Sequence, residues 1–141
     1  MRYRVVAVGR VRDAALRAAC DEYVERLRHY THVEEREVKD EARVLGAVPE
    51  GSRLVALAHT GDQWTSSEVA EWTGKWERDS RDVTFAIGGA DGLQDDVLRT
   101  AERVWSLSRL TFPHELARVL LYEQLYRAYT IRRGEPYHRG P

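Results

Sequence analysis

The chain has 141 residues, of which 43% are hydrophobic, and a formal net charge of -1 at pH 7. This length suffices for one core, so we expect a single domain over residues 1–141. The charge argues against a uniformly basic nucleic-acid clamp but allows a local basic patch. The single cysteine, Cys20, excludes a disulfide within one chain and indicates a reducing, cytoplasmic location. No stretch approaches the ~20 apolar residues of a membrane span, so we expect no membrane partner.

The apolar and β-branched runs predict five strands, at Tyr3–Val8, Val33–Val38, Arg53–Ala58, Val83–Ile87 and Ser106–Leu110. Apolar residues at helical spacing predict helices over Asp13–Tyr30, Asp40–Val48, 66–78, Gln94–Trp105 and His114–Ile131, with a loop at His59–Asp62. Strands alternate with helices throughout. This order is typical of an α/β fold with a mostly parallel sheet, right-handed crossovers and helices on both faces.

Three glycines, Gly88, Gly89 and Gly92, follow the fourth strand. They do not form the Gly-x-Gly-x-x-Gly dinucleotide fingerprint, which belongs after the first strand, and the chain has no Gly-x-x-x-x-Gly-Lys-Ser/Thr phosphate loop. The pattern alone therefore leaves two interpretations open, a tight turn and a backbone contact with a small ligand.

Other chemistry has little support in the sequence. His29 and His32 lie three residues apart, but no carboxylate or second pair completes a metal site, so we expect no metal. A nucleophile elbow for serine catalysis is also missing.

The last predicted helix carries apolar residues on more than one stripe, among them Leu116, Leu120 and Leu125. A helix of this kind buries two sides, either in a larger core or against another subunit, and the size of the chain favours a homodimer. The tail at 132–141 is basic and contains an aromatic residue; by itself it is typical of a solvated terminus.

Four ordered motifs carry a resemblance to a known family. They are Ile87-Gly88-Gly89-x-x-Gly92-Leu93, Trp105-Ser106-Leu107-Ser108-x-Leu110-Thr111-Phe112-Pro113-His114, Arg118-Val119-Leu120-x-x-Glu123-Gln124-Leu125-Tyr126-Arg127-Ala128 and Pro136-Tyr137-His138-Arg139. With Val6-Ala7-Val8-Gly9 near the start, they resemble the small stand-alone SPOUT methyltransferases that methylate N3 of a pseudouridine in bacterial 23S ribosomal RNA. The resemblance spans the chain and is densest from Val83 onward.

The resemblance implies a deep trefoil knot in the C-terminal half, an exception to the rule that chains do not thread their own loops. It also implies a homodimer, S-adenosylmethionine as methyl donor, and 23S rRNA as substrate; the nearly neutral charge favours recognition of this rRNA within the large subunit or the whole ribosome. Carried over residue by residue, it predicts that the cofactor is bound by Leu57, Gly89, Leu107, Ser108, Arg109, Leu110, Thr111 and Phe112.

On the RNA side, the resemblance and the residue chemistry predict catalytic roles for Arg127, Tyr137, His138 and Arg139, with each site completed across the dimer. His138 is our hypothesis for the proton acceptor, because imidazole titrates near neutral pH. For Arg118 two interpretations stay open, an ion pair with Glu115 or with the partner chain, and an RNA contact.

The sequence departs from the family in two places. The segment Lys39–Pro49 is shorter than usual, and Ala58 stands where relatives often have aspartate. Two rival functions remain: a non-catalytic RNA-binding protein that kept the fold, and a doubly wound α/β module for another nucleotide, which would have no knot.

Overall fold

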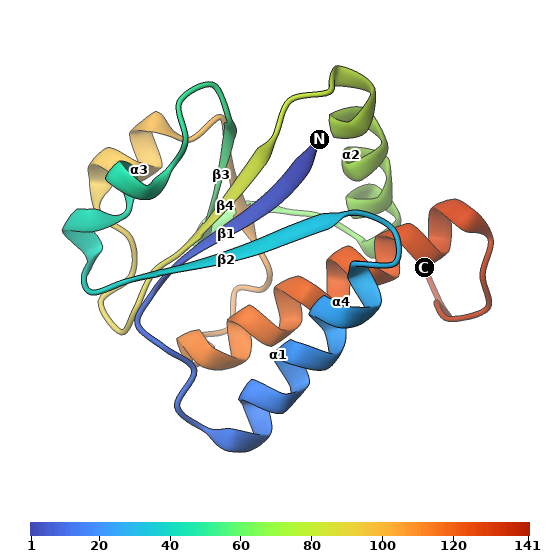
Figure 1. The fold of residues 1–141 in the computed structure, drawn as a ribbon, viewed down its shortest axis with the longest axis horizontal. Helices are drawn as coiled ribbons and strands as arrows, with labels where there is room; N and C mark the ends of the chain where they lie inside the picture. Colours follow the sequence, from blue (N-terminus) through green and yellow to red (C-terminus); the bar gives the residue numbers. More distant parts are fainter.

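The computed structural model describes all residues, 1–141, and shows one sheet with helices on both faces (Figure 1). In chain order the elements are β1 (Arg2–Val8), α1 (Ala14–Leu27), β2 (His32–Val38), the 3-10 turns η1 (Glu41–Arg43) and η2 (Leu45–Ala47), β3 (Arg53–Gln63), α2 (Ser66–Asp79), β4 (Val83–Ile87), α3 (Asp95–Thr100), β5 (Arg103–Ser106) and α4 (His114–Arg133). None of the helices combines the length and the apolar character that crossing a membrane requires.

The five strands are all parallel and lie in the order β2-β1-β4-β3-β5. Helices α1, α4 and α2 cover one face, with α4 packed against both of the others, and Figure 1 shows α1 and α4 running side by side. The opposite face is covered by α3 and the two 3-10 turns. The predicted parallel α/β fold with helices on both faces is therefore confirmed.

The central strand β4 is buried along its whole length, which is why Val83–Ile87 is continuously apolar. On the face covered by α1, α2 and α4, Phe85 packs against Tyr3, Trp76 and Trp105, with ring centroids 5.7–6.1 Å apart. Cys20 is buried in this core, and burial raises the pKa of its thiol to about 11, so Cys20 is an inert structural residue.

The fifth strand does not lie where the sequence predicted it. Helix α3 ends at Thr100, because Ala101 adopts an extended conformation, and β5 follows at once as Arg103–Ser106. The predicted strand Ser106–Leu110 is a loop instead. Ser108 closes this loop locally: its carbonyl accepts from the Ser106 hydroxyl at 3.0 Å, and its own hydroxyl accepts from the amide of Leu110 at 3.0 Å.

Two further predictions need correction. The helix expected over Asp40–Val48 is a pair of 3-10 turns. The loop expected at His59–Asp62 lies inside β3, which pairs with β5 up to Leu57, shifts register, and pairs again from Asp62. The residues between these two points leave the ladder, so part of the expected loop character is present within the strand.

Arg118 of α4 is 1% exposed and is tied to the sheet. Its guanidinium donates to Glu37 of β2 at 2.6 Å and to the carbonyl of Gly9 at 2.9 Å. The predicted ion pair between Arg118 and Glu115 is wrong, because the Glu115 carboxylate accepts hydrogen bonds from the amides of Arg12 and Asp13. Arg118 is thus a structural ion-pair residue that holds α4 to the ends of β1 and β2.

Replacing Arg118 with alanine is expected to lower the free energy of unfolding by about 3 kcal/mol, because a buried, hydrogen-bonded charge pair is broken. Urea unfolding followed by circular dichroism measures this change. The control is Arg43→Ala, which removes an exposed pair with Asp40 at 3.6 Å and should leave stability nearly unchanged. Equal effects of the two variants would contradict the structural role of Arg118.

Candidate cofactor and RNA site

A cavity of about 350 Å³ opens where β3, β4 and β5 end. Carboxyl ends of neighbouring parallel strands meet at one edge of the sheet, where α/β folds place their ligands. Three segments line the cavity: the end of the first part of β3, the glycine-rich turn after β4, and the loop after β5 with the start of α4. Its lining residues are Leu57, Ala58, His59, Ile87, Gly88, Gly89, Ala90, Asp91, Gly92, Trp105, Leu107, Ser108, Leu110, Thr111, Phe112, His114 and Ala117.

The turn after β4 requires glycine at two positions. A Cβ atom on Gly88 would lie 2.4 Å from the carbonyl carbon of Gly92, and Gly92 itself has a φ of +75°. The turn is closed by a hydrogen bond of 3.0 Å from the amide of Gly92 to the carbonyl of Gly89. Backbone therefore forms this wall, with little side-chain bulk between the turn and a ligand.

The loop after β5 forms another part of the lining. Arg109 is not among the lining residues, and its guanidinium donates to the carbonyl of His59, which links the loop to β3. Leu110 lines the cavity but is 70% exposed, and no other large hydrophobic side chain of the protein is as open to solvent. An apolar loop tip of this kind is suited to cover a ligand or to meet a second surface.

The structure brings nearly all the predicted cofactor residues together. Those that line the cavity are Leu57, Gly89, Leu107, Ser108, Leu110, Thr111 and Phe112, whereas Arg109 does not. Sequence analysis did not include His59, Asp91 and Ala117 in the site. His59 lies two residues after Leu57, Asp91 lies within the glycine-rich turn, and Ala117 lies one helical turn beyond Pro113. Their neighbours in sequence were therefore the available signal.

Three of the other predicted residues, Arg127 of α4 and Tyr137 and His138 of the tail, form a separate cluster. Arg127 donates to Glu123 at 2.6 Å and contacts Nδ1 of His138 at 3.0 Å, and the Tyr137 hydroxyl donates to Glu123 at 2.7 Å. Burial and the hydrogen bond to Glu123 raise the pKa of Tyr137 well above its ordinary value, so this phenol stays protonated. Arg139 is exposed and makes no contact of this kind. Glu123 organises the cluster, and its spacing of four residues from Arg127 could have indicated this.

The contact with Arg127 determines the tautomer of His138. A guanidinium group only donates hydrogen bonds, so Nδ1 of His138 accepts and the ring proton lies on Nε2. Nε2 is buried without a partner. His138 can accept a proton at Nδ1 only after its contact with Arg127 is released.

Within one chain this cluster is separated from the cavity. Ala117 lines the cavity and Arg127 lies ten residues further along α4, a distance of about 15 Å at the rise of an α-helix. A second cavity of about 450 Å³ lies between them, where Pro141 approaches Leu107 and Phe112. The end of the tail thus returns toward the loop, but Tyr137 and His138, which follow the end of α4 at Arg133, contact the distant part of this helix at Glu123 and Arg127.

Residues 1–138 match a family model described as a predicted SPOUT methyltransferase. The chain belongs to the SPOUT methyltransferase family. Membership of this family implies the C-terminal knot and argues against the rival function, an unknotted doubly wound module for another nucleotide.

Several curated relatives match this chain over nearly their full length. A protein of Sorangium cellulosum is 48% identical over 143 residues, covering 97% of this chain and 99% of that protein. One of Geobacter metallireducens is 44% identical over 155 residues, covering 99% and 100%. Both are named ribosomal RNA large subunit methyltransferase H.

Solved structures support the fold. A protein of Haemophilus influenzae described as a probable methylase family protein superimposes with a TM-score of 0.63 at 10% identity, covering 98% of this chain and 70% of that one. The SpoU methyltransferase of Streptomyces viridochromogenes, solved in complex with S-adenosylmethionine, superimposes with a TM-score of 0.52 at 14% identity, covering 94% and 58%.

SPOUT methyltransferases use S-adenosylmethionine as methyl donor, and the cavity fits this molecule. Its volume lies within the usual range of small-molecule sites, and nine of its 17 lining residues are hydrophobic. At Gly88, Gly89 and Gly92 the lining consists of backbone without side chains, beside these apolar walls. The residues present can therefore hold an adenosine-sized ligand through packing and backbone contacts.

Replacing Gly88 with alanine is expected to weaken S-adenosylmethionine binding by about tenfold or more, because the new Cβ displaces the Gly92 turn that lines the cavity. Isothermal titration calorimetry measures the affinity. Gly46→Ala is the matched control, since a Cβ there meets nothing within 4 Å. Unchanged binding by the Gly88 variant would place the cofactor elsewhere.

Proposed function

We propose that this protein transfers a methyl group from S-adenosylmethionine to N3 of a pseudouridine in 23S rRNA, on assembled ribosomes in the cytoplasm. The observation that carries the proposal is the full-length similarity, at 39–48% identity, to proteins named ribosomal RNA large subunit methyltransferase H. The cavity described above supports it, because the residues expected to bind the donor converge there.

Methyl transfer is an in-line displacement, so the protein mainly aligns donor and acceptor. Bound S-adenosylmethionine would supply an electrophilic methyl group. The glycine turn and the loop Leu107–Phe112 hold the donor and exclude water, and Arg127, Tyr137, His138 and Arg139 contact the RNA. Glu123 positions Arg127 and Tyr137, and His138 accepts the N3 proton once its contact with Arg127 is exchanged for the substrate.

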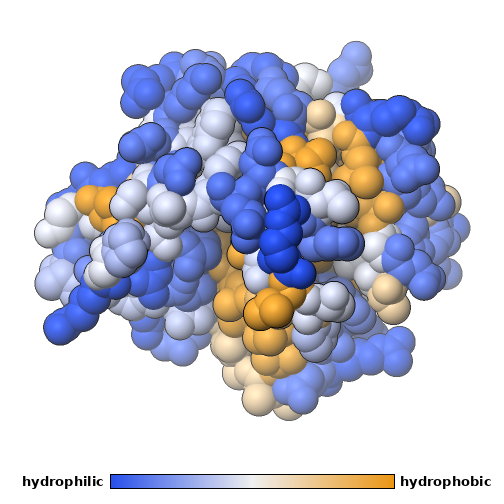
Figure 2. Space-filling model, turned by 180° about the vertical axis from the view of Figure 1, so that it is seen from behind, coloured by the Kyte–Doolittle hydropathy of each residue, from blue (hydrophilic) through white to orange (hydrophobic).

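The proposal includes a homodimer in which each cavity meets the partner's tail. Two features of the single chain support this arrangement. Arg127, in the cluster around Glu123, lies about 15 Å along α4 from Ala117 at the cavity of its own chain. Leu116 and Leu120 of α4 remain half-buried, and Leu110 is exposed, so an apolar surface is available beside the cavity. Figure 2 shows that apolar groups gather in patches on the rear face.

The test is transfer of radiolabelled methyl from S-adenosylmethionine to whole ribosomes, separated subunits and free 23S rRNA from a strain that lacks the modification. We expect label on assembled ribosomes and its loss when the target pseudouridine is replaced by uridine. A folded protein that binds these RNAs and transfers no label would instead be the rival, a non-catalytic RNA-binding protein with the same fold.

A mixing experiment tests the shared site. Gly88→Ala impairs the cavity and His138→Ala impairs the tail, so each variant alone should transfer little methyl. After the two are co-refolded, half of the dimers are mixed and each has one intact site, so about a quarter of wild-type activity should return. Activity that stays at the level of the single variants would show that cavity and tail act within one chain.

A further inference from the structure

An aromatic ladder runs outward from the cofactor cavity. Trp105 lines the cavity and stacks on Trp64 with ring centroids 5.0 Å apart, and Trp64 packs on Trp72 of α2 at 5.2 Å. Trp105 is buried, whereas Trp64 and Trp72 are half-buried. The ladder therefore joins the wall of the cavity to the surface formed by α2 and β5.

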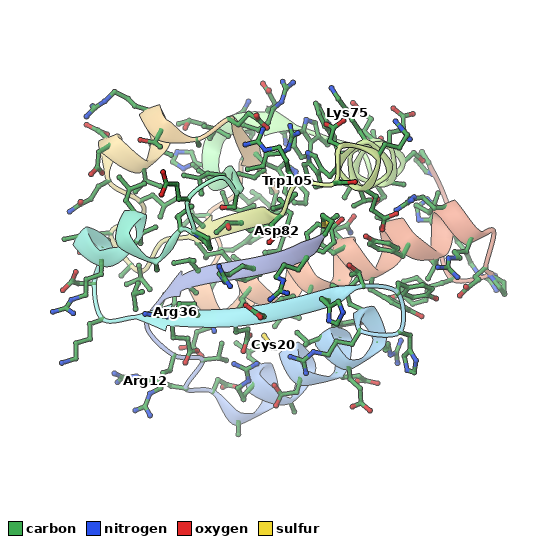
Figure 3. All side chains as sticks on the ribbon, turned by 45° about the horizontal axis from the view of Figure 1, so that its top comes forward. Arg12, Cys20, Arg36, Lys75, Asp82 and Trp105 are labelled. Carbon is green, nitrogen blue, oxygen red and sulfur yellow. The ribbon has the colours of Figure 1, made fainter.

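Two cations share the outer ring of this ladder. The guanidinium carbon of Arg103, the first residue of β5, lies 4.4 Å from the centroid of Trp72, and Nζ of Lys75 lies 5.2 Å from it. Both cations are exposed. Figure 3 shows Lys75 on α2 and Arg36 on β2, at opposite sides of the sheet.

Neither cation is neutralised by a carboxylate. Three acidic residues of this side pair with other arginines: Asp79 and Glu102 pair with Arg53, and Glu77 pairs with Arg132. Lys75 and Arg103 form no ion pair. One cation on a tryptophan face is ordinary surface packing, but two on the same ring leave a local charge that a polyanion can neutralise.

We infer that Trp72, Lys75 and Arg103 form a docking surface for a strand of ribosomal RNA beside the target nucleotide. The inference rests on the proposed function, which supplies RNA as the partner. The two cations contact backbone phosphates, and a base stacks on the planar group that Trp72 and Arg103 form together. Phosphate and base are both needed to match this surface, which favours nucleic acid over an acidic protein.

The main test uses the double variant Lys75→Ala/Arg103→Ala in steady-state methyl transfer to ribosomes. We expect KM for the RNA substrate to rise by about tenfold, with kcat at saturation and S-adenosylmethionine affinity unchanged, because the surface binds RNA and touches no reacting atom. The slope of log affinity for free 23S rRNA against log salt should fall by about 1.4, the value for two lost contacts to a single strand.

The matched control is Arg36→Ala, which removes an exposed arginine on the opposite edge strand β2 that also forms no ion pair. This variant should keep the wild-type KM and salt slope. The exchange Lys75→Arg/Arg103→Lys keeps both positive charges but removes the planar guanidinium beside Trp72. It should therefore show the wild-type salt slope while KM stays above the wild-type value, which separates charge from stacking.

Three outcomes would overturn the inference: an unchanged KM and salt slope in the double variant, an equal change in Arg36→Ala, or a defect accompanied by loss of S-adenosylmethionine binding. Failure of the proposed function is recognised separately. In that case the wild-type protein transfers no methyl group. The salt slopes for binding to free 23S rRNA can still be compared between the wild-type protein and the variants.

Discussion

The parallel alignment of β3, β4 and β5 is the constraint on which the site depends. Because these strands are neighbours in the sheet and run the same way, the turns that follow Leu57, Ile87 and Ser106 meet at one edge. Three loops can share that edge only if their backbones approach closely, and Gly88 and Gly92 permit this approach. The register shift in β3 adds to it by taking Ala58 and His59 out of the ladder and into the lining of the cavity.

Local sequence determined most elements but could not determine strand pairing. Val83–Ile87 was predictable because both faces of β4 are buried, which demands an unbroken apolar run. Ser106–Leu110 was expected to be a strand from its length and its place before Pro113, but hydrogen bonds of the Ser108 side chain and carbonyl make it a loop. The extension of β3 to Gln63 depends on pairing with Ser106, a contact between distant residues that no local pattern contains.

The candidate site shows the same division. The family motifs predicted which residues converge on the cavity, because motif spacing preserves the order of the turns. They did not show that the guanidinium of Arg109 binds the carbonyl of His59 on β3, since this contact depends on where β3 lies. Likewise, the partner of Arg118 is Glu37 rather than Glu115, because Glu37 lies on β2 beside the end of β1.

The arrangement of charge explains how a nearly neutral protein can serve an RNA substrate. The chain has 22 basic and 23 acidic residues, so its average charge predicts no affinity for RNA. Many arginines, however, are occupied: Arg118 with Glu37, Arg127 with Glu123 and Arg132 with Glu77. These pairs fix the helices and contribute little long-range field. The cations that remain unpaired therefore determine where a polyanion is attracted, and their position on the surface matters more than the total charge.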